Sequence, residues 1–229
     1  MVNKKYVILP AVGIAIVAAV VGISLSTSGA QDRVASTETQ KTETQANSAL
    51  DMFSGGSPAL GSPGAPVTMV EFGDYQCQNC NRYFRNTEHL ILQNYVETGK
   101  LKIIFVDFAF IGPDSLPAAQ AAHCANDQGK YWEYHDETYS NWDGENTGWA
   151  GIHNLKMFAA NIGLDQNSFN QCLDGGKYAK KVEANTELGH KIGVTGTPTF
   201  FIIDSEGEAV KIVGAQPYSS FEKTLDSKL

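Results

Sequence analysis

The chain has 229 residues and a formal net charge of −8, from 25 acidic and 17 basic side chains. Two of those basic residues, Lys4 and Lys5, are the only charged residues among the first thirty, so the remainder carries 15 basic and 25 acidic groups, a net charge of −10. Such a surface repels nucleic acid, and no basic stripe is present, which excludes a nucleic-acid-binding protein. About 165 residues remain after the non-globular N-terminal part, which is enough for one domain.

The N-terminal segment 6–25 is an apolar run of the length that a membrane-spanning helix requires, about 20 residues. Lys4 and Lys5 precede it, and the next basic residue is Arg33. This bias places the first few residues in the cytoplasm and everything downstream outside the membrane. We therefore predict a single-pass signal-anchor. The alternative is a signal peptide cleaved near Ala30, which would yield a secreted protein.

The next segment, 26–56, is rich in Ser, Thr, Gln and Gly and has too little apolar content to bury a core, so it is predicted to be a flexible linker. A small apolar cluster at its end could dock on the folded part: Ala49, Leu50, Met52 and Phe53. The turn-rich run 61–66 marks the boundary. The folded domain is expected over 57–229.

A reactive motif follows the first predicted strand. Val67–Phe72 reads as a buried strand, and Cys77 and Cys80 then open a segment whose apolar residues recur at helical spacing. A cysteine at a helix N-terminus is stabilised as a thiolate by free N–H groups and the helix dipole. The second cysteine lies one turn further on and can close a disulfide with the first or resolve a mixed disulfide.

The same Cys-x-x-Cys spacing also occurs in zinc sites, which require two further ligands. The sequence has no second Cys-x-x-Cys and no His-x₃-His pattern, and an exported location favours disulfide chemistry. We therefore predict no metal site. The alternative of another class is a membrane-tethered metal-binding protein in which Cys77 and Cys80 hold copper or zinc.

A second motif lies near the C-terminus, where Thr197-Pro198 directly precedes an apolar strand. Proline cannot donate to a strand ladder, so its position needs a reason. One such reason is a cis bond that packs against the reactive pair and offers main-chain groups to an extended substrate.

Together these motifs resemble the DsbA family of thiol–disulfide oxidoreductases. The resemblance is carried by the runs 71–80, 128–136 and 196–200, and it is closest to the membrane-tethered DsbA-like proteins of archaea and Gram-positive bacteria. It implies that Cys77 is the nucleophile, that Cys80 is the resolving thiol, and that Thr197 and Pro198 form the cis-proline loop beside them.

The resemblance implies an α/β protein with a thioredoxin fold: a central mixed sheet flanked by helices, with an all-helical insert. The sequence agrees with this fold class. A second strand is predicted over 101–108, helices alone over about 114–192, a terminal hairpin over 200–203 and 209–213, and a last helix over 219–228.

The resemblance also implies that the protein forms disulfides in exported proteins, with the Cys77–Cys80 disulfide as its only redox group and a quinone-linked membrane protein as its reoxidant. A reductase or isomerase of the same fold is the alternative. Gln78 and Asn79 stand where the strongly oxidising bacterial members have Pro-His, so we expect a milder oxidant. Family members carry a buried acid at the position of Glu71; a solvated carboxylate is the alternative.

The other two cysteines, Cys124 and Cys172, occupy core-facing positions on predicted helices. Because exported proteins rarely keep two buried thiols free, a structural disulfide is predicted between them. Two independent core cysteines, or a second redox pair, are the alternatives. Asp107 and Asp114, at the ends of the second strand region, are expected to be solvated loop acids.

Overall fold

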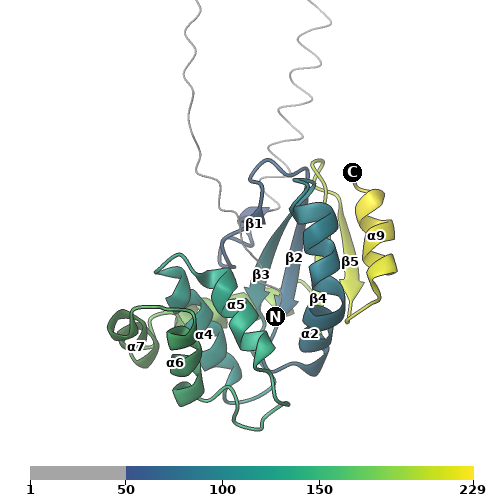
Figure 1. The fold of residues 1–229 in the computed structure, drawn as a ribbon. Helices are drawn as coiled ribbons and strands as arrows, with labels where there is room; N and C mark the ends of the chain where they lie inside the picture. The colour runs from purple at the N-terminus through teal and green to yellow at the C-terminus, as the bar shows by residue number, and fades with distance from the viewer. Residues whose placement is uncertain (1–49) are drawn as a thin grey trace, which may run out of the picture. The chain divides into compact units, whose positions relative to one another are not determined.

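The computed structural model describes residues 50–229 (Figure 1). The predicted signal-anchor, the alternative cleavage position and most of the predicted linker lie outside the described residues. None of the helices between residues 50 and 229 combines the length and the apolar content that crossing a membrane requires.

The centre of the domain is a five-stranded mixed sheet with the strand order β1-β3-β2-β4-β5. Its strands are β1 (Leu60–Gly61), β2 (Val67–Gly73), β3 (Leu101–Asp107), β4 (Thr199–Ile203) and β5 (Ala209–Val213). Strands β2 and β3 are parallel, whereas β1 pairs antiparallel with β3, β4 with β2, and β5 with β4. All residues of β2 are buried, as expected for a central strand covered on both faces.

One face of the sheet is covered by the helix that follows β2 and by α9 (Tyr218–Asp226). The first of these begins as α2 (Gln78–Tyr83) and continues through η1 (Phe84–Glu88), α3 (His89–Ile91) and η2 (Leu92–Val96), where η marks wider π-type turns. Aromatic rings join the layers: Tyr83 and Phe221 both contact Phe200 of β4, with ring centroids 4.6 and 4.9 Å away.

Between β3 and β4 the chain forms five helices. They are α4 (Ser115–Asn126), α5 (Tyr131–Ser140), α6 (Ile152–Asn161), α7 (Gln166–Asp174) and α8 (Ala179–Lys191). Figure 1 shows α4, α5, α6 and α7 grouped at one side of the domain, with α9 at the opposite side next to β5. The predicted fold class, a mixed sheet with an inserted helical region, is confirmed.

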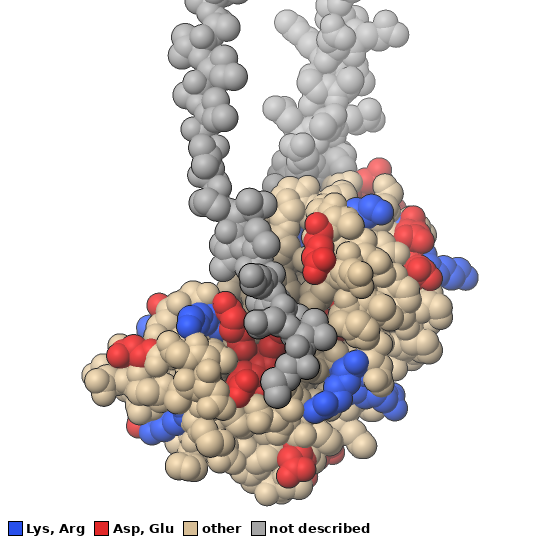
Figure 2. Space-filling model, viewed as in Figure 1, with Lys and Arg blue, Asp and Glu red and all other residues tan. Residues whose placement is uncertain are grey.

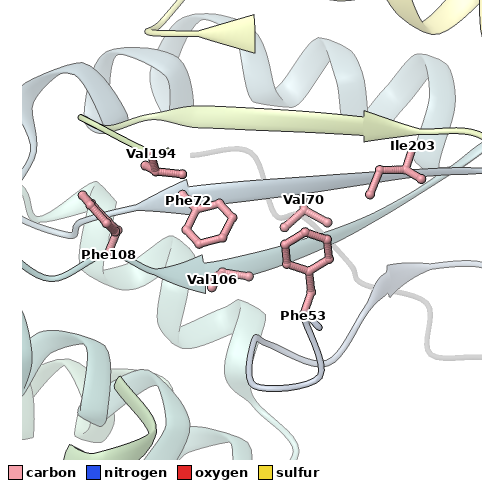
Figure 3. Close-up of a cluster of buried hydrophobic side chains, with 7 residues drawn as sticks. All are labelled: Phe53, Val70, Phe72, Val106, Phe108, Val194 and Ile203. Carbon is pink, nitrogen blue, oxygen red and sulfur yellow. The ribbon is translucent and has the colours of Figure 1, made fainter. Parts of the chain in front are cut away.

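The other face of the sheet carries a cluster of buried apolar side chains (Figure 3): Phe53, Val70, Phe72, Val106, Phe108, Val194 and Ile203. Phe53 belongs to the apolar cluster at the end of the predicted linker that was expected to dock on the folded part, and it is only 4% exposed. Its ring lies edge-on to Phe72 at 6.0 Å and stacks on Phe201 at 6.4 Å. Burying a phenylalanine contributes about 1.5–3 kcal/mol, so this segment is part of the core.

The expectation that Asp107 is a solvated loop acid is wrong. It is 1% exposed, and its Oδ2 lies 2.7 Å from Nε2 of His123 on α4 and accepts a hydrogen bond from Nδ2 of Asn185 on α8 at 2.8 Å. The end of β3 is therefore tied to two helices of the insert, because burial of a carboxyl group requires hydrogen-bonding partners.

On the molecular surface, Lys and Arg side chains are interspersed with Asp and Glu over the face that Figure 2 shows. The described residues on this face form no continuous basic area.

Candidate active site

The two cysteines of the reactive motif lie at the start of α2. After β2 the chain makes a turn, closed by a hydrogen bond from the Cys77 N–H to the Asp74 carbonyl at 3.0 Å, and α2 begins one residue later. Cys77 is the N-cap residue, and its sulfur accepts a hydrogen bond from the Cys80 N–H at 3.4 Å. Both cysteines are free thiols in this structure, with Cys77 4% and Cys80 1% exposed.

The residues between the cysteines, Gln78 and Asn79, are exposed. The pair therefore lies at the start of a helix in which buried and exposed residues alternate. At the end of β2, a Cβ atom at Gly73 would overlap the ring of Phe105 on β3. Only glycine fits there.

The second predicted motif lies directly beside the first. The Thr197–Pro198 peptide bond is cis, and the thiol of Cys77 donates to the Thr197 carbonyl oxygen at 3.3 Å. Both residues are buried. Two motifs that are 120 residues apart in the chain are thus in hydrogen-bonding contact.

The two thiols differ in acidity because their surroundings differ. The adjacent Cys80 thiol is the main cause that lowers the pKa of Cys77 to about 7; burial opposes it, and the N–H groups of Cys80 and Asn79 support it. Burial raises the pKa of Cys80 well above its usual value, and the hydrogen bond to Cys77 adds to the increase. Because the thiolate is the reactive form of a cysteine, Cys77 is the thiol of the pair whose surroundings favour reaction.

Glu71 is buried behind the cysteine pair. It is 4% exposed and pairs with Phe200 across β2 and β4, so strand alternation directs its side chain toward the face covered by α2. Burial raises the pKa of Glu71 well above its usual value, and the negative charges of Glu88 and Cys77 act in the same direction. A raised pKa favours the protonated form of this carboxylic acid, which is the form that can donate a proton.

Asp74 fixes the turn before the cysteines, a role that the sequence analysis did not assign. Its Oδ2 accepts hydrogen bonds from the N–H groups of Phe110 and Ile111 at 2.9 and 3.0 Å, and its Oδ1 accepts one from Gln76 at 2.9 Å. The side chain therefore ties the β2–α2 turn to the loop after β3.

The helical insert holds the same turn from the other side. Trp142 donates through Nε1 to the Gln76 carbonyl at 3.0 Å, and the hydroxyl of Tyr139 donates to the Asp74 carbonyl at 3.2 Å. The Asn146 N–H donates to Oε1 of Gln76 at 3.0 Å. These contacts were not predicted from the sequence, in which only the density of Trp, Asn and Gly over 141–149 hints at a specific loop.

The remaining two cysteines lie in the insert, Cys124 on α4 and Cys172 on α7. They form a disulfide with a Cα–Cα distance of 5.8 Å. Within residues 50–229, no three His, Cys, Asp or Glu side chains are grouped so that they could hold a metal ion.

An acidic thiol at a helix start, a second thiol buried behind it and a main-chain loop beside the first suit thiol–disulfide exchange. On a mixed sheet of this topology, they define a thiol–disulfide oxidoreductase. A family model described as Thioredoxin matches residues 54–227, and the chain belongs to that family.

Individual relatives place it more narrowly. The chain is 27% identical over 177 residues to disulfide bond formation protein D of Bacillus subtilis (strain 168). The matched region covers 76% of this chain and 78% of that protein. Two crystal structures superpose well. BdbD from Bacillus subtilis has a TM-score of 0.68 at 25% identity, over 76% of this chain and 92% of that one. Alpha-DsbA1 of Wolbachia pipientis has a TM-score of 0.66 at 28% identity, over 74% and 89%.

These matches confirm the predicted resemblance to the DsbA family and the thiol–disulfide oxidoreductase activity.

Proposed function

We propose that the protein forms disulfide bonds in exported proteins through Cys77 and Cys80. The observation that carries this proposal is the asymmetry of the pair: Cys77 is the acidic thiol at the start of α2, and Cys80 is the buried thiol of raised pKa behind it. The name of the Bacillus subtilis relative, disulfide bond formation protein D, supports the direction of the reaction.

The exchange proceeds in two steps that balance in atoms and electrons. A substrate thiolate attacks the sulfur of Cys77 in the Cys77–Cys80 disulfide, which forms a mixed disulfide and releases Cys80 as a thiolate. A second substrate thiolate then attacks the substrate sulfur of the mixed disulfide and releases Cys77. The substrate loses two electrons and two protons, which the cysteine pair gains.

Glu71 is the proton donor and acceptor that we assign to this cycle. Cys80 leaves as a thiolate in a buried place where its neutral form is favoured, so it needs a proton at once. Glu71 lies close enough for its charge to raise the pKa of Cys80, and its own raised pKa keeps a proton available.

The proposal includes location and recycling. The apolar run 6–25, preceded by two lysines, supports a signal-anchor with the domain outside the cytoplasm. The reduced pair would then pass its electrons to a quinone-linked membrane protein, and its substrates would be exported proteins with reduced cysteines.

A second candidate, disulfide isomerase or reductase, is favoured by the moderate acidity of Cys77. A pKa of about 7 leaves about half of the thiol ionised at pH 7. Such a value is near that of thioredoxin, about 7, and far from the value of the strong oxidant DsbA, about 3.5. Gln78 and Asn79 supply no positive charge beside the thiolate.

The reduction potential separates the two candidates. We would equilibrate the full-length chain with glutathione buffers and measure the fraction of Cys77–Cys80 disulfide. A disulfide donor is expected at or above the isomerase range, about −180 mV, because oxidants approach about −120 mV. A potential near that of thioredoxin, about −270 mV, would contradict the proposed direction and assign the protein as a reductant.

A further inference from the structure

A carboxylate of the helical insert lies at the start of the active-site helix. Glu145 belongs to the loop between α5 and α6, and its Oε1 accepts a hydrogen bond from the main-chain N–H of Gln78 at 2.9 Å. Gln78 is the first residue of α2 and follows Cys77 directly. The Glu145 side chain is exposed, and the reaction described above does not use it.

The loop that carries Glu145 is fixed on both sides of it. Trp142 and Asn146 both donate hydrogen bonds to Gln76 at 3.0 Å, and Gln76 is fully buried. Asn146 has a φ of 58°, in the left-handed region that asparagine tolerates better than most residues. The carboxylate is therefore held at the helix start by a fixed loop. The next residue, Asn146, is bonded to the buried Gln76 side chain, and the carboxylate itself is bonded to the residue that follows Cys77.

The main-chain N–H groups of this helix turn are shared by two acidic groups. The N–H of Cys80 donates to the Cys77 sulfur at 3.4 Å, whereas the N–H of Gln78 donates to Glu145. In the disulfide form Cys77 carries no charge, so the Glu145 carboxylate is the only one of the two acidic groups that is charged at the positive end of the helix. In the reduced form the Cys77 thiolate meets a negative charge in the same turn, and like charges repel.

The other titratable groups around the pair come from three elements and one turn. They are Glu71 on β2, Cys80 on α2, Tyr139 on α5, and Asp74 in the turn before α2. Burial raises the pKa of each of them, which favours the uncharged form. Thr197, in the loop before β4, brings no charge. Glu145 differs from these groups because it is exposed to solvent and bonded to the helix start.

We propose that Glu145 is a positioning residue for the redox pair: it holds a negative charge at the start of α2 and thereby keeps Cys77–Cys80 a weaker oxidant. The insert would then do more than hold the β2–α2 turn, because one of its loops sets how strongly the pair draws electrons. This inference rests on thiol–disulfide exchange by Cys77 and Cys80, and it holds for either direction of the physiological reaction.

The test compares Glu145→Gln with Asp143→Asn in the full-length chain. Glutamine keeps an oxygen that accepts from the Gln78 N–H and removes only the charge. Asp143 is an exposed acid of the same loop whose only described hydrogen bond is through its main-chain carbonyl, so its variant removes the same charge without touching α2. The equilibrium constant with glutathione and the pH midpoint of Cys77 alkylation are measured for both.

At about pH 8.5 and low salt, Glu145→Gln is expected to shift the equilibrium about two- to fivefold in the oxidising direction, the usual size of a charge effect at a helix end. The alkylation midpoint should move to lower pH. The shift should shrink in about 1 M salt, which screens exposed charges. It should vanish at about pH 5.5, where Cys77 is a neutral thiol.

An equal shift in Asp143→Asn, no shift at about pH 8.5, or a shift that persists at about pH 5.5 would overturn the role of Glu145. A wild-type chain that never equilibrates with glutathione would instead refute the exchange activity itself. The two failures are thus distinguishable in one experiment.

Discussion

The sulfur of Cys77 lies 3.3 Å from the carbonyl oxygen of Thr197, to which its thiol donates. This carbonyl can accept from the neutral thiol but offers nothing to a thiolate, which needs donors such as the Cys80 N–H. Deprotonation of Cys77 therefore frees a main-chain acceptor beside the reacting sulfur. We propose that an extended substrate chain donates a main-chain hydrogen bond to it, as an added strand does at the edge of a sheet.

The acidity of Cys77 can be read from its reactivity. Alkylation of the reduced protein by iodoacetamide should rise with pH and reach half its maximum at about pH 7. Because the Cys80 thiol is the main cause of this low pKa, Cys80→Ala should move the midpoint toward about 8.5, the value of a free cysteine. A wild-type midpoint above pH 8 would refute the assignment.

The same shift has a consequence for stability. The pKa of Cys77 is lower in the folded than in the unfolded chain, so its contribution is full above the unfolded value, about 8.5, and is lost as the pH falls through about 7. In denaturant unfolding, the free energy of unfolding of the reduced protein should therefore decrease as the pH falls through about 7. The oxidised protein, which lacks the thiol, should not show this decrease.

Glu71 should make the folded state less stable as the pH rises. Its pKa is raised in the folded state, so between the unfolded value, about 4.3, and the folded value the native chain binds more protons than the unfolded one. Glu71→Gln should flatten the decline of the unfolding free energy above about pH 4.3. Glu222→Gln, an exposed acid of α9, serves as the control. Identical pH profiles for wild type and Glu71→Gln would contradict a buried, protonated Glu71.

The disulfide of the insert should stabilise the fold without taking part in exchange. It closes a loop with a sequence separation of 48. Replacing Cys124 and Cys172 together by alanine should lower the unfolding free energy by about 2–4 kcal/mol, measured by urea unfolding. Exchange with glutathione should be retained. A folded double variant that no longer exchanges disulfides would show instead that these cysteines are a second redox pair.

Asp74 should matter for both stability and rate. Asp74→Ala leaves three main-chain N–H groups without their acceptor, and each unsatisfied buried group costs about 1–3 kcal/mol. We expect at least about 2 kcal/mol of destabilisation, together with slower exchange because the turn before Cys77 loosens. Asp114→Ala, next to α4, is the matched control, since its side chain makes no capping bond. Equal effects of the two variants would refute the role of Asp74.

Much of the fold could be predicted from local pattern. Strands β2, β3 and β5 agree with their predicted ranges within one residue because long apolar or alternating runs leave little choice. Strand β1 was missed, since two residues carry no period. Docking of the cluster that contains Phe53 was expected, but the face that Phe53 covers could not be predicted, because that face is assembled from strands far along the chain.

The site was predictable where its chemistry is local and not where it is tertiary. Short sequence motifs indicate the function of Cys77, Cys80 and Pro198 without any knowledge of the tertiary structure. Asp107 was misjudged because its partners, His123 and Asn185, are 16 and 78 residues away. Glu145 could not have been singled out, since nothing in its neighbourhood along the chain indicates a contact with a residue 67 positions earlier.

The most direct test of the account is to trap the exchange intermediate. Cys80→Ala is incubated with a peptide that carries one disulfide, and the covalent adduct is mapped by mass spectrometry, with Cys77→Ala in parallel. The account predicts a stable mixed disulfide on Cys77 in Cys80→Ala and no adduct in Cys77→Ala. An adduct on Cys80 in Cys77→Ala, with none on Cys77 in Cys80→Ala, would contradict the assignment of Cys77 as the nucleophile.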